Sequence, residues 1–294
     1  MITILGATGN IGGRAAEVLL AQGEKVRVLA RSKDKVAGLV AKGAEAKIGD
    51  ANDVNYLTEA FKGSDAVFAL IPPNFAVADF RKYQNEFGEA VTKALEASGV
   101  KKIVFLSSIA AHLPAKTGPI VGTHDQEKRM KERLKSADIL FLRPAYFMEN
   151  LLANIGLIKA AGINGSVIKG DVSMHLVATK DIGDVAAAKL ASRDFKGHSV
   201  LGISGPERLT MAQVTRAIGE AIGNPGLAYV AFPSKDAIEA MKQAGLTEDL
   251  ASKYAEMSES LNDGTINEVD SPSVKGKVGI QEFVKSVFLP AFKA

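Results

Sequence analysis

The hydrophobic positions of the first 150 residues form short apolar runs separated by longer amphipathic segments. The apolar runs predict buried strands at residues 2–5, 25–30, 44–48, 65–71, 102–106 and 138–142. The intervening segments predict helices at residues 14–22, 53–61, 80–98 and 123–136. Strand and helix therefore alternate, as a parallel sheet with crossover helices requires. Because such crossovers are right-handed, we expect an α/β fold with an open, doubly wound parallel Rossmann sheet.

The alternation weakens after residue 150. Short apolar segments near 166–168 and 175–177 are separated by Gly and Asp, and Asp181 is expected to cap a helix over 182–192. Thr210 and Gln213 have the spacing of a capping box, and further helices are predicted within 234–261 and 280–289. The pattern indicates a Rossmann domain over residues 1–150, with a segment near 175–204 returning to it. Residues 151–294 are expected to form a smaller, mostly helical lobe that binds substrate.

A glycine-rich turn follows the first predicted strand. Gly6, Gly9 and Gly12 are spaced three residues apart, and a helix follows them. Glycines permit a tight turn and a close approach of the backbone, and a helix N-terminus offers free N–H groups to a pyrophosphate. The alternative is a purely structural turn, but the strand–turn–helix context favours dinucleotide binding. The residues expected to hold the cofactor here are Gly6, Thr8, Gly9, Asn10 and Ile11.

The end of the second strand indicates which dinucleotide binds. An acidic residue there accepts from the ribose 2′-OH of NAD, whereas a basic one accommodates the 2′-phosphate of NADP. This chain has Arg31 at that point, which favours NADP(H), unless Arg31 is only a solvated loop residue. Asp50 follows the third strand and is placed to meet the adenine, although it can equally be a turn or cap residue. Leu70, Ile71 and Pro72 follow the fourth strand and are expected to pass beside the cofactor.

Composition narrows the remaining possibilities. The net charge is +3 with no dense basic tract, which argues against nucleic acid as a direct partner. There are no cysteines, and the four histidines are scattered, so neither a disulfide nor a metal site is expected. The chain shows no signal region and no apolar run of membrane-spanning length. We therefore expect a cytoplasmic protein with a small-molecule substrate and no membrane partner; a homodimer remains open.

Several further motifs resemble those of one family. Over essentially its full length the chain resembles the NmrA-like group of atypical short-chain dehydrogenases/reductases. Within that group it is most similar to the NADPH quinone oxidoreductase and triphenylmethane-dye reductase branch. The segments that carry the resemblance are Gly6-Ala-Thr-Gly-Asn-Ile-Gly12, Arg31, Gly49-Asp50, Ser107-Ser108, Arg143-Pro-Ala-Tyr-Phe-Met-Glu-Asn150, Asp181-Ile-Gly-Asp-Val185 and Gly205-Pro-Glu-Arg-Leu-Thr210.

The resemblance also has one important departure. Typical members of the superfamily carry a catalytic Tyr four residues before a Lys, but here His124 stands in the Tyr position, with Lys128 one helical turn later. His124 is a candidate proton donor and substrate contact, and its alternative is a helix residue bonded to a neighbouring loop. Lys128 is the second catalytic candidate, and its alternative is a solvated surface lysine.

The resemblance also bears on four residues near the nicotinamide and the substrate. Ser107 is expected to contact this part of the cofactor rather than to act as a nucleophile. Tyr146 and Phe147 are expected to wall the pocket, with Tyr146 also touching substrate; core packing is their alternative. Phe75 is expected to complete an apolar slot for the substrate.

Two functions from different classes follow. The first is an NADPH-dependent reductase that transfers a hydride to a quinone or a similarly conjugated, dye-like acceptor, which needs positioning more than a strong protein acid. The second is a non-catalytic NADP(H)-sensing regulatory protein of the NmrA type, with which a missing Tyr is equally compatible. A sugar-nucleotide or aromatic-ether reductase is a third possibility, and the missing Tyr argues against its sugar-nucleotide form.

Overall fold

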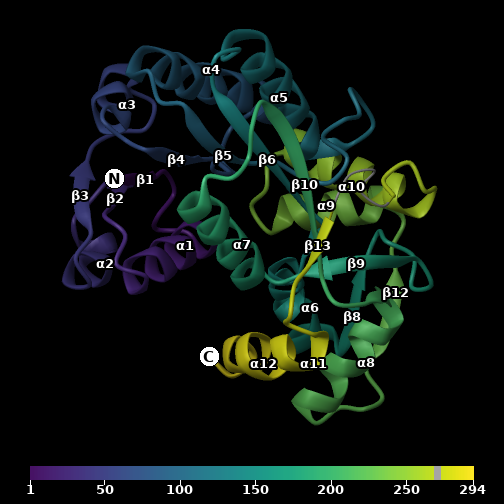
Figure 1. The fold of residues 1–294 in the computed structure, drawn as a ribbon. Helices are drawn as coiled ribbons and strands as arrows, with labels where there is room; N and C mark the ends of the chain where they lie inside the picture. Colours follow the sequence, from purple (N-terminus) through teal and green to yellow (C-terminus); the bar gives the residue numbers. More distant parts are fainter. Residues whose placement is uncertain (268–272) are drawn as a thin grey trace.

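The computed structural model describes residues 1–267 and 273–294 and is built around one parallel sheet of eight strands (Figure 1). Across the sheet the strands lie in the order β13-β10-β6-β5-β4-β1-β2-β3. Their bounds are β1 (Ile2–Ile4), β2 (Val26–Ala30), β3 (Glu45–Ile48), β4 (Ala66–Ala69), β5 (Lys102–Leu106), β6 (Asp138–Pro144), β10 (His198–Ser204) and β13 (Ser273–Lys275). The chain runs outward from β1 to β3 and then returns to β4, so the strand order reverses between β1 and β4. The predicted doubly wound Rossmann architecture is confirmed, and all six predicted strands form within two residues of their expected bounds.

Helices cover both faces of this sheet (Figure 1). One face carries α1 (Asn10–Ala21), α2 (Ala37–Ala41) and α7 (Thr179–Ser192). The other carries α3 (Val54–Phe61), α4 (Phe80–Ser98) and α5 (Val121–Arg133). Helices α1 and α7 pack directly on each other although they are far apart in sequence.

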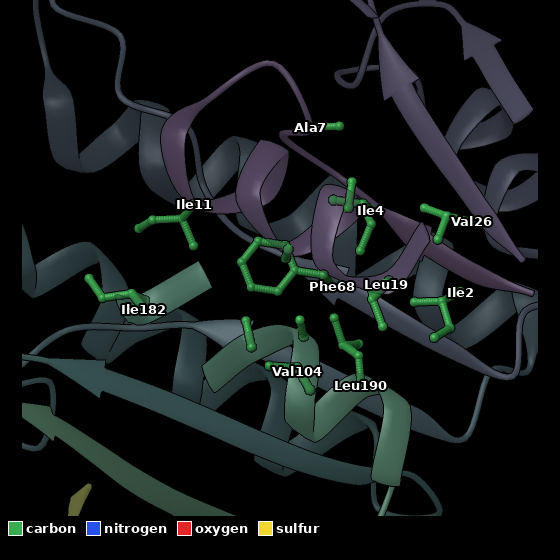
Figure 2. Close-up of a cluster of buried hydrophobic side chains, with 14 of the residues drawn as sticks. Ile2, Ile4, Ala7, Ile11, Leu19, Val26, Phe68, Val104, Ile182 and Leu190 are labelled. Atoms are coloured by element: carbon green, nitrogen blue, oxygen red, sulfur yellow. The ribbon is translucent and has the colours of Figure 1, made fainter. Parts of the chain in front are cut away.

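The buried side chains follow the alternation that a two-faced sheet requires. In β4, Phe68 packs with α1 and α7, while Val67 on the opposite side packs with α3 and α4. In β5, Val104 joins the first group in the same way (Figure 2). Figure 2 shows Ile11 and Leu19 of α1 and Ile182 and Leu190 of α7 converging on this layer. Both faces of the sheet are therefore buried, as its near-continuous apolar strands predict.

The second half of the chain adds a lobe with its own core. Its helices are α6 (Ile155–Ala161), α8 (Met211–Ile222), α9 (Ser234–Gln243), α10 (Glu248–Asn262), α11 (Ile280–Phe283) and α12 (Leu289–Lys293). Two small sheets accompany them, formed by β7 (Tyr146–Phe147), β8 (Ile163–Ser166), β9 (Ser173–Val177), β11 (Arg208–Thr210) and β12 (Ala228–Ala231). The lobe is thus helical with more strand than the sequence predicts. The expected return of 175–204 to the sheet corresponds to α7 and β10. The boundary at residue 150 stays a prediction, and residues 268–272 of the predicted lobe lie outside the described residues.

Two local predictions are corrected. Helix α1 begins at Asn10 rather than Arg14, because Gly12 lets its first turn pack on the preceding loop: a Cβ on Gly12 would lie 2.4 Å from the Gly6 carbonyl oxygen. Asp181 does not cap α7, whose N-cap is Ala178. Its buried carboxylate instead accepts hydrogen bonds from the backbone N–H groups of Lys277 and Val278, both at 2.9 Å. The predicted capping box at Thr210 is confirmed.

Candidate functional site

The glycine turn between β1 and α1 forms a backbone cradle at the carboxyl edge of the sheet. Gly6 has a φ of +79°, a conformation that favours glycine, and Gly9 is the N-cap of α1 with no side-chain cap. The first N–H groups of a helix have no partner within the helix, so those of Asn10 and Ile11 are available to an external acceptor. Thr8, Gly9 and Asn10 are exposed. This end of α1 is therefore an uncapped, positively polarised site that suits a phosphate.

The loops after β2, β3 and β4 lie around this turn. The Leu70 side chain is so close to Gly6 that a Cβ on Gly6 would come within 2.8 Å of it. Arg31 is exposed directly after β2. The pKa of Asp50 is lowered mainly by hydrogen bonds from the backbone and side chain of Asn52, and further by the charge of Arg31. Asp50 thus forms a turn, which was the alternative to an adenine contact in the sequence analysis. It also lies close to Arg31.

The loop after β4 also lies near the charge of Arg31. The Tyr83 hydroxyl donates to the Pro72 carbonyl oxygen at 2.9 Å. Burial raises the pKa of Tyr83, and the charge of Arg31 opposes that rise, which places Arg31 near this loop. Ile71 is half-buried, whereas Phe75 further along the loop is 49 % exposed. The structure therefore brings Arg31, Asp50 and the Leu70–Pro72 segment together around the turn, with Phe75 at the surface.

A buried ionic cluster joins the ends of β5 and β6 to α5. Glu127 is 2 % exposed, and its Oε1 accepts from the Ser107 hydroxyl at 2.6 Å and from Arg143 Nε at 2.8 Å. Its Oε2 accepts from Arg143 Nη2 at 2.6 Å and Lys131 Nζ at 3.0 Å. Burial by itself would raise the pKa of Glu127, but these hydrogen bonds and the charges of Arg143 and Lys131 outweigh it and lower the pKa. The Ser107 hydroxyl is thus directed into the protein, and its contact with a cofactor stays a prediction.

A cavity of about 360 Å³ lies between the carboxyl ends of β6 and β10 and the lobe. Its apolar lining includes Ile109 after β5, Met174 on β9 and Met257 on α10. Tyr146 also lines it, whereas Phe147, the next residue, packs with the sheet core instead. The two side chains of β7 therefore point to opposite sides, and Tyr146 is the one that faces the cavity. The full set of described lining residues is Ile109, Ile120, Ala145, Tyr146, Val172, Ser173, Met174, His175, Ile203, Ser204, Arg208, Met257, Leu261, Gly264, Ile266, Asn267, Ser273 and Lys275.

The two catalytic candidates on α5 lie outside this lining. His124 is half-buried, and its Nδ1 lies 3.0 Å from the Ala111 carbonyl oxygen. This is the contact with a neighbouring loop that the sequence offered as the alternative to a catalytic role. The Lys128 side chain is 69 % exposed and lies 4.0 Å from Glu132. Their catalytic roles stay predictions.

In the described part of the chain, no helix is long and apolar enough to cross a membrane.

Comparison with known proteins places this fold in a family. The model of the NmrA-like family matches residues 1–284. The chain belongs to the NmrA-like family. The resemblance inferred from the glycine turn and the later motifs is thereby confirmed.

Proteins similar in sequence or in fold to this NmrA-like protein include enzymes and a regulator. The NAD(P)H azoreductase of Xenophilus azovorans is 29 % identical over 265 residues, which cover 87 % of this chain and 86 % of the relative. The NADPH-dependent quinone oxidoreductase QOR2 of Escherichia coli, solved with NADPH, shares the fold with a TM-score of 0.77 at 21 % identity, covering 98 % of this chain and all of the other. NmrA, a negative transcriptional regulator solved with NADP, has a TM-score of 0.76 at 14 % identity, with 99 % and 96 % covered.

Sequence reasoning missed the partners of Ser107 in this NmrA-like chain. Arg143 ends an apolar strand, and a buried arginine needs an acid to pair with, which is a signal that the sequence contains. The acid is Glu127, one of several on a highly charged helix, and only the packing of α5 on the sheet selects it.

Proposed function

We propose that this protein is an NADPH-dependent reductase that transfers a hydride to a quinone or a similarly conjugated acceptor. One observation carries the proposal. The uncapped N-terminus of α1 and the largely apolar cavity lie at the same edge of one parallel sheet, on either side of the β1–β4 reversal. In doubly wound folds this edge is where a dinucleotide and its substrate meet. The azoreductase and quinone oxidoreductase relatives support an NAD(P)H-dependent oxidoreductase, and the choice of acceptor is ours.

The residues of the turn fit a dinucleotide phosphate. A Cβ built on Gly9 would meet only the Gly6 carbonyl oxygen, at 3.5 Å, so the space in front of the N-terminus of α1 is open. The N–H groups there would hold the pyrophosphate, and Arg31 and Asp50 would lie beside the adenosine end. NADPH, when bound, supplies the hydride. The protein's contribution is to hold both reactants in line.

The cavity suits a flat, apolar acceptor. Its lining is predominantly apolar, from the β5 loop, β9 and α10, and also includes polar side chains such as Ser204, Arg208 and Lys275. A volume of about 360 Å³ lies within the range of roughly 300–1,000 Å³ typical of small-molecule sites. A quinone or dye is reactive enough that solvent can deliver the final proton, which agrees with the absence of a Tyr in the usual position of α5.

Oxidation of NADPH against a panel of quinones, azo dyes and triphenylmethane dyes tests the proposal. Turnover with at least one class is expected. Tight NADPH binding without turnover on any acceptor would contradict it and favour the second candidate, an NADP(H) sensor, which the shared fold of the regulator NmrA supports.

The position of Arg31 predicts a preference for NADPH over NADH. Loss of a charge-assisted contact to the 2′-phosphate costs about 1.5–3 kcal/mol, or roughly ten- to over a hundredfold in affinity. Arg31→Ala should therefore weaken NADPH binding by that factor and leave NADH binding nearly unchanged, as measured by titration calorimetry. Lys35→Ala, which removes an exposed charge four residues later, is the matched control and should affect neither cofactor. An equal loss of affinity for NADPH and NADH in Arg31→Ala would show that Arg31 does not contact the 2′-phosphate.

A further inference from the structure

The tyrosine hydroxyls of this chain divide into two groups. Of the five tyrosines, three have a hydroxyl that donates a hydrogen bond to the protein. They are Tyr56, which donates to Lys47; Tyr83, which donates to Pro72; and Tyr229, which donates to Ile168. Within residues 1–267 and 273–294, the hydroxyls of Tyr146 and Tyr254 donate no hydrogen bond to the protein, although the Tyr146 oxygen receives one from the Asn150 side chain. Tyr146 is the one of these two that lines the cavity.

Tyr146 is held in place by the fold around it. It begins β7, one residue after the end of β6, and β7 pairs with β9, with Tyr146 opposite Leu176. The N–H of Ala145 donates to the Ile203 carbonyl oxygen at 2.8 Å, which ties the preceding residue to β10. The ring packs on one side against the core of the lobe. A hydroxyl on a well-anchored ring that lines a cavity and donates to no protein atom can donate to a molecule bound in that cavity.

From this geometry we infer that Tyr146 is a catalytic residue that donates a hydrogen bond to the acceptor atom on which negative charge develops. The inference rests on the proposed reductase function. When the acceptor takes up a hydride, one of its oxygen or nitrogen atoms gains the electron pair, and a fixed donor beside that atom stabilises it in a site with little water. The O–H bond of Tyr146 does not break. The proton that completes the reduction comes from solvent water after the hydride has been transferred.

The surroundings of the phenol favour a neutral donor over a proton-releasing acid. Burial raises the pKa of Tyr146 above its ordinary value near 10, and the neighbouring Tyr254 and Tyr229 add to this rise, while the side chain of Asn150 opposes it. A phenol that holds its proton this tightly is a poor acid but remains a hydrogen-bond donor throughout the neutral pH range. This separates its role from that predicted for His124, whose ring bonds to Ala111 and lies outside the cavity lining.

Tyr146→Phe tests the inference, because it removes one oxygen atom and keeps the ring. We expect kcat for NADPH-dependent reduction of 1,4-naphthoquinone to fall about ten- to a hundredfold. This is less than the fall of about a hundred- to a thousandfold that follows removal of a hydrogen-bond donor from an oxyanion hole. The dissociation constant of 1,4-naphthoquinone, measured on the protein without NADPH, should change less than about threefold, because the uncharged acceptor gains little from the bond. The melting temperature and the NADPH dissociation constant should stay at the wild-type values.

Two matched variants make the outcome decisive. Tyr229→Phe removes a hydroxyl of the same lobe that is already bonded within the protein, to Ser166 and Ile168, and should lower kcat less than about threefold. Tyr254→Phe removes the other hydroxyl that donates to no protein atom, one outside the cavity lining, and should do the same. An unchanged kcat in Tyr146→Phe, or an equal fall in either control, would overturn the role of Tyr146 while leaving the reductase function intact. A wild-type protein that reduces no acceptor would instead overturn the proposed function itself.

Discussion

Replacing Gly9 with valine is expected to abolish dinucleotide binding without unfolding the protein. Gly9 is the N-cap of α1, with φ −94° and ψ 169°, an extended conformation that valine adopts readily. A Cβ at this position would meet protein only at 3.5 Å, so the added side chain would occupy the space in front of the helix where we place the pyrophosphate. We expect NADPH affinity to fall at least about a hundredfold, equivalent to about 2.7 kcal/mol, measured by titration calorimetry. The far-UV circular dichroism spectrum should stay native.

Substitutions of two other glycines serve as comparisons for Gly9→Val. Gly38→Val adds the same side chain on α2, where nothing lies within 4 Å of the new Cβ, and should leave NADPH affinity unchanged. Gly12→Val should lower stability as well as binding, because its Cβ would lie 2.4 Å from the Gly6 carbonyl oxygen, and backbone cannot move aside cheaply. Wild-type NADPH affinity in Gly9→Val would show that the phosphate lies elsewhere.

Replacing Glu127 with glutamine is expected to cause the largest loss of stability. The carboxylate is almost completely buried and accepts four hydrogen bonds, from Ser107, Lys131 and two nitrogens of Arg143. Glutamine keeps the shape but leaves the buried charge of Arg143 without its counterion. Removing one partner of a buried pair costs about 3–5 kcal/mol, so chemical denaturation at neutral pH should show a loss of that size. Glu132→Gln, on an exposed position of the same helix, should cost less than about 0.5 kcal/mol.

The same carboxylate makes stability depend on pH in a defined direction. The pKa of Glu127 in the folded protein is lowered, so the unfolded state binds the proton more readily. The contribution of Glu127 is therefore fully present above its ordinary pKa of about 4.5 and is lost as pH falls through the lowered folded value. Wild type and Glu127→Gln should consequently approach each other in stability as the solution becomes acidic. A difference that stays constant from pH 7 to pH 3 would contradict this assignment of the charge.

The fold could be read from the sequence wherever one local pattern determined one element. The apolar run at 102–106 and the amphipathic stretch at 80–98 became β5 and α4 with unchanged bounds, since burial on the sheet and the left-handed Gly99 set their ends. The start of α1 could not be read, because two glycines inside a helix are unfavourable locally and are explained only by contact with the turn that they pack against. The partner of Asp181 lay almost a hundred residues away, at Val278. No local pattern contains such a pairing.

The candidate site likewise has parts that the sequence predicts and parts that it does not. The glycine turn, which we propose holds the phosphate, is one continuous motif, so its glycines could be named from the sequence, and the parallel sheet places Arg31 and Pro72 beside it. The cavity is assembled from β6, β9, β10 and α10, whose relative positions depend on packing between distant segments. Tyr146 could be named because it directly follows a strand. The opposite orientations of Tyr146 and Phe147 follow from the pairing of β7 with β9, which the sequence did not reveal.

The short strand β13 has a consequence for synthesis of the protein on the ribosome. It pairs with the last three residues of β10, Gly202–Ser204, and it enters the sheet roughly 70 residues after them in the chain. At about 5–20 residues per second, a nascent chain that has formed β10 keeps this end of its outer edge unpaired for about 4–14 s. An unpaired edge is a template for pairing with other chains. Aggregation during translation should therefore depend on how quickly the final helices and β13 emerge, more than on the speed with which the glycine turn and its neighbouring strands fold.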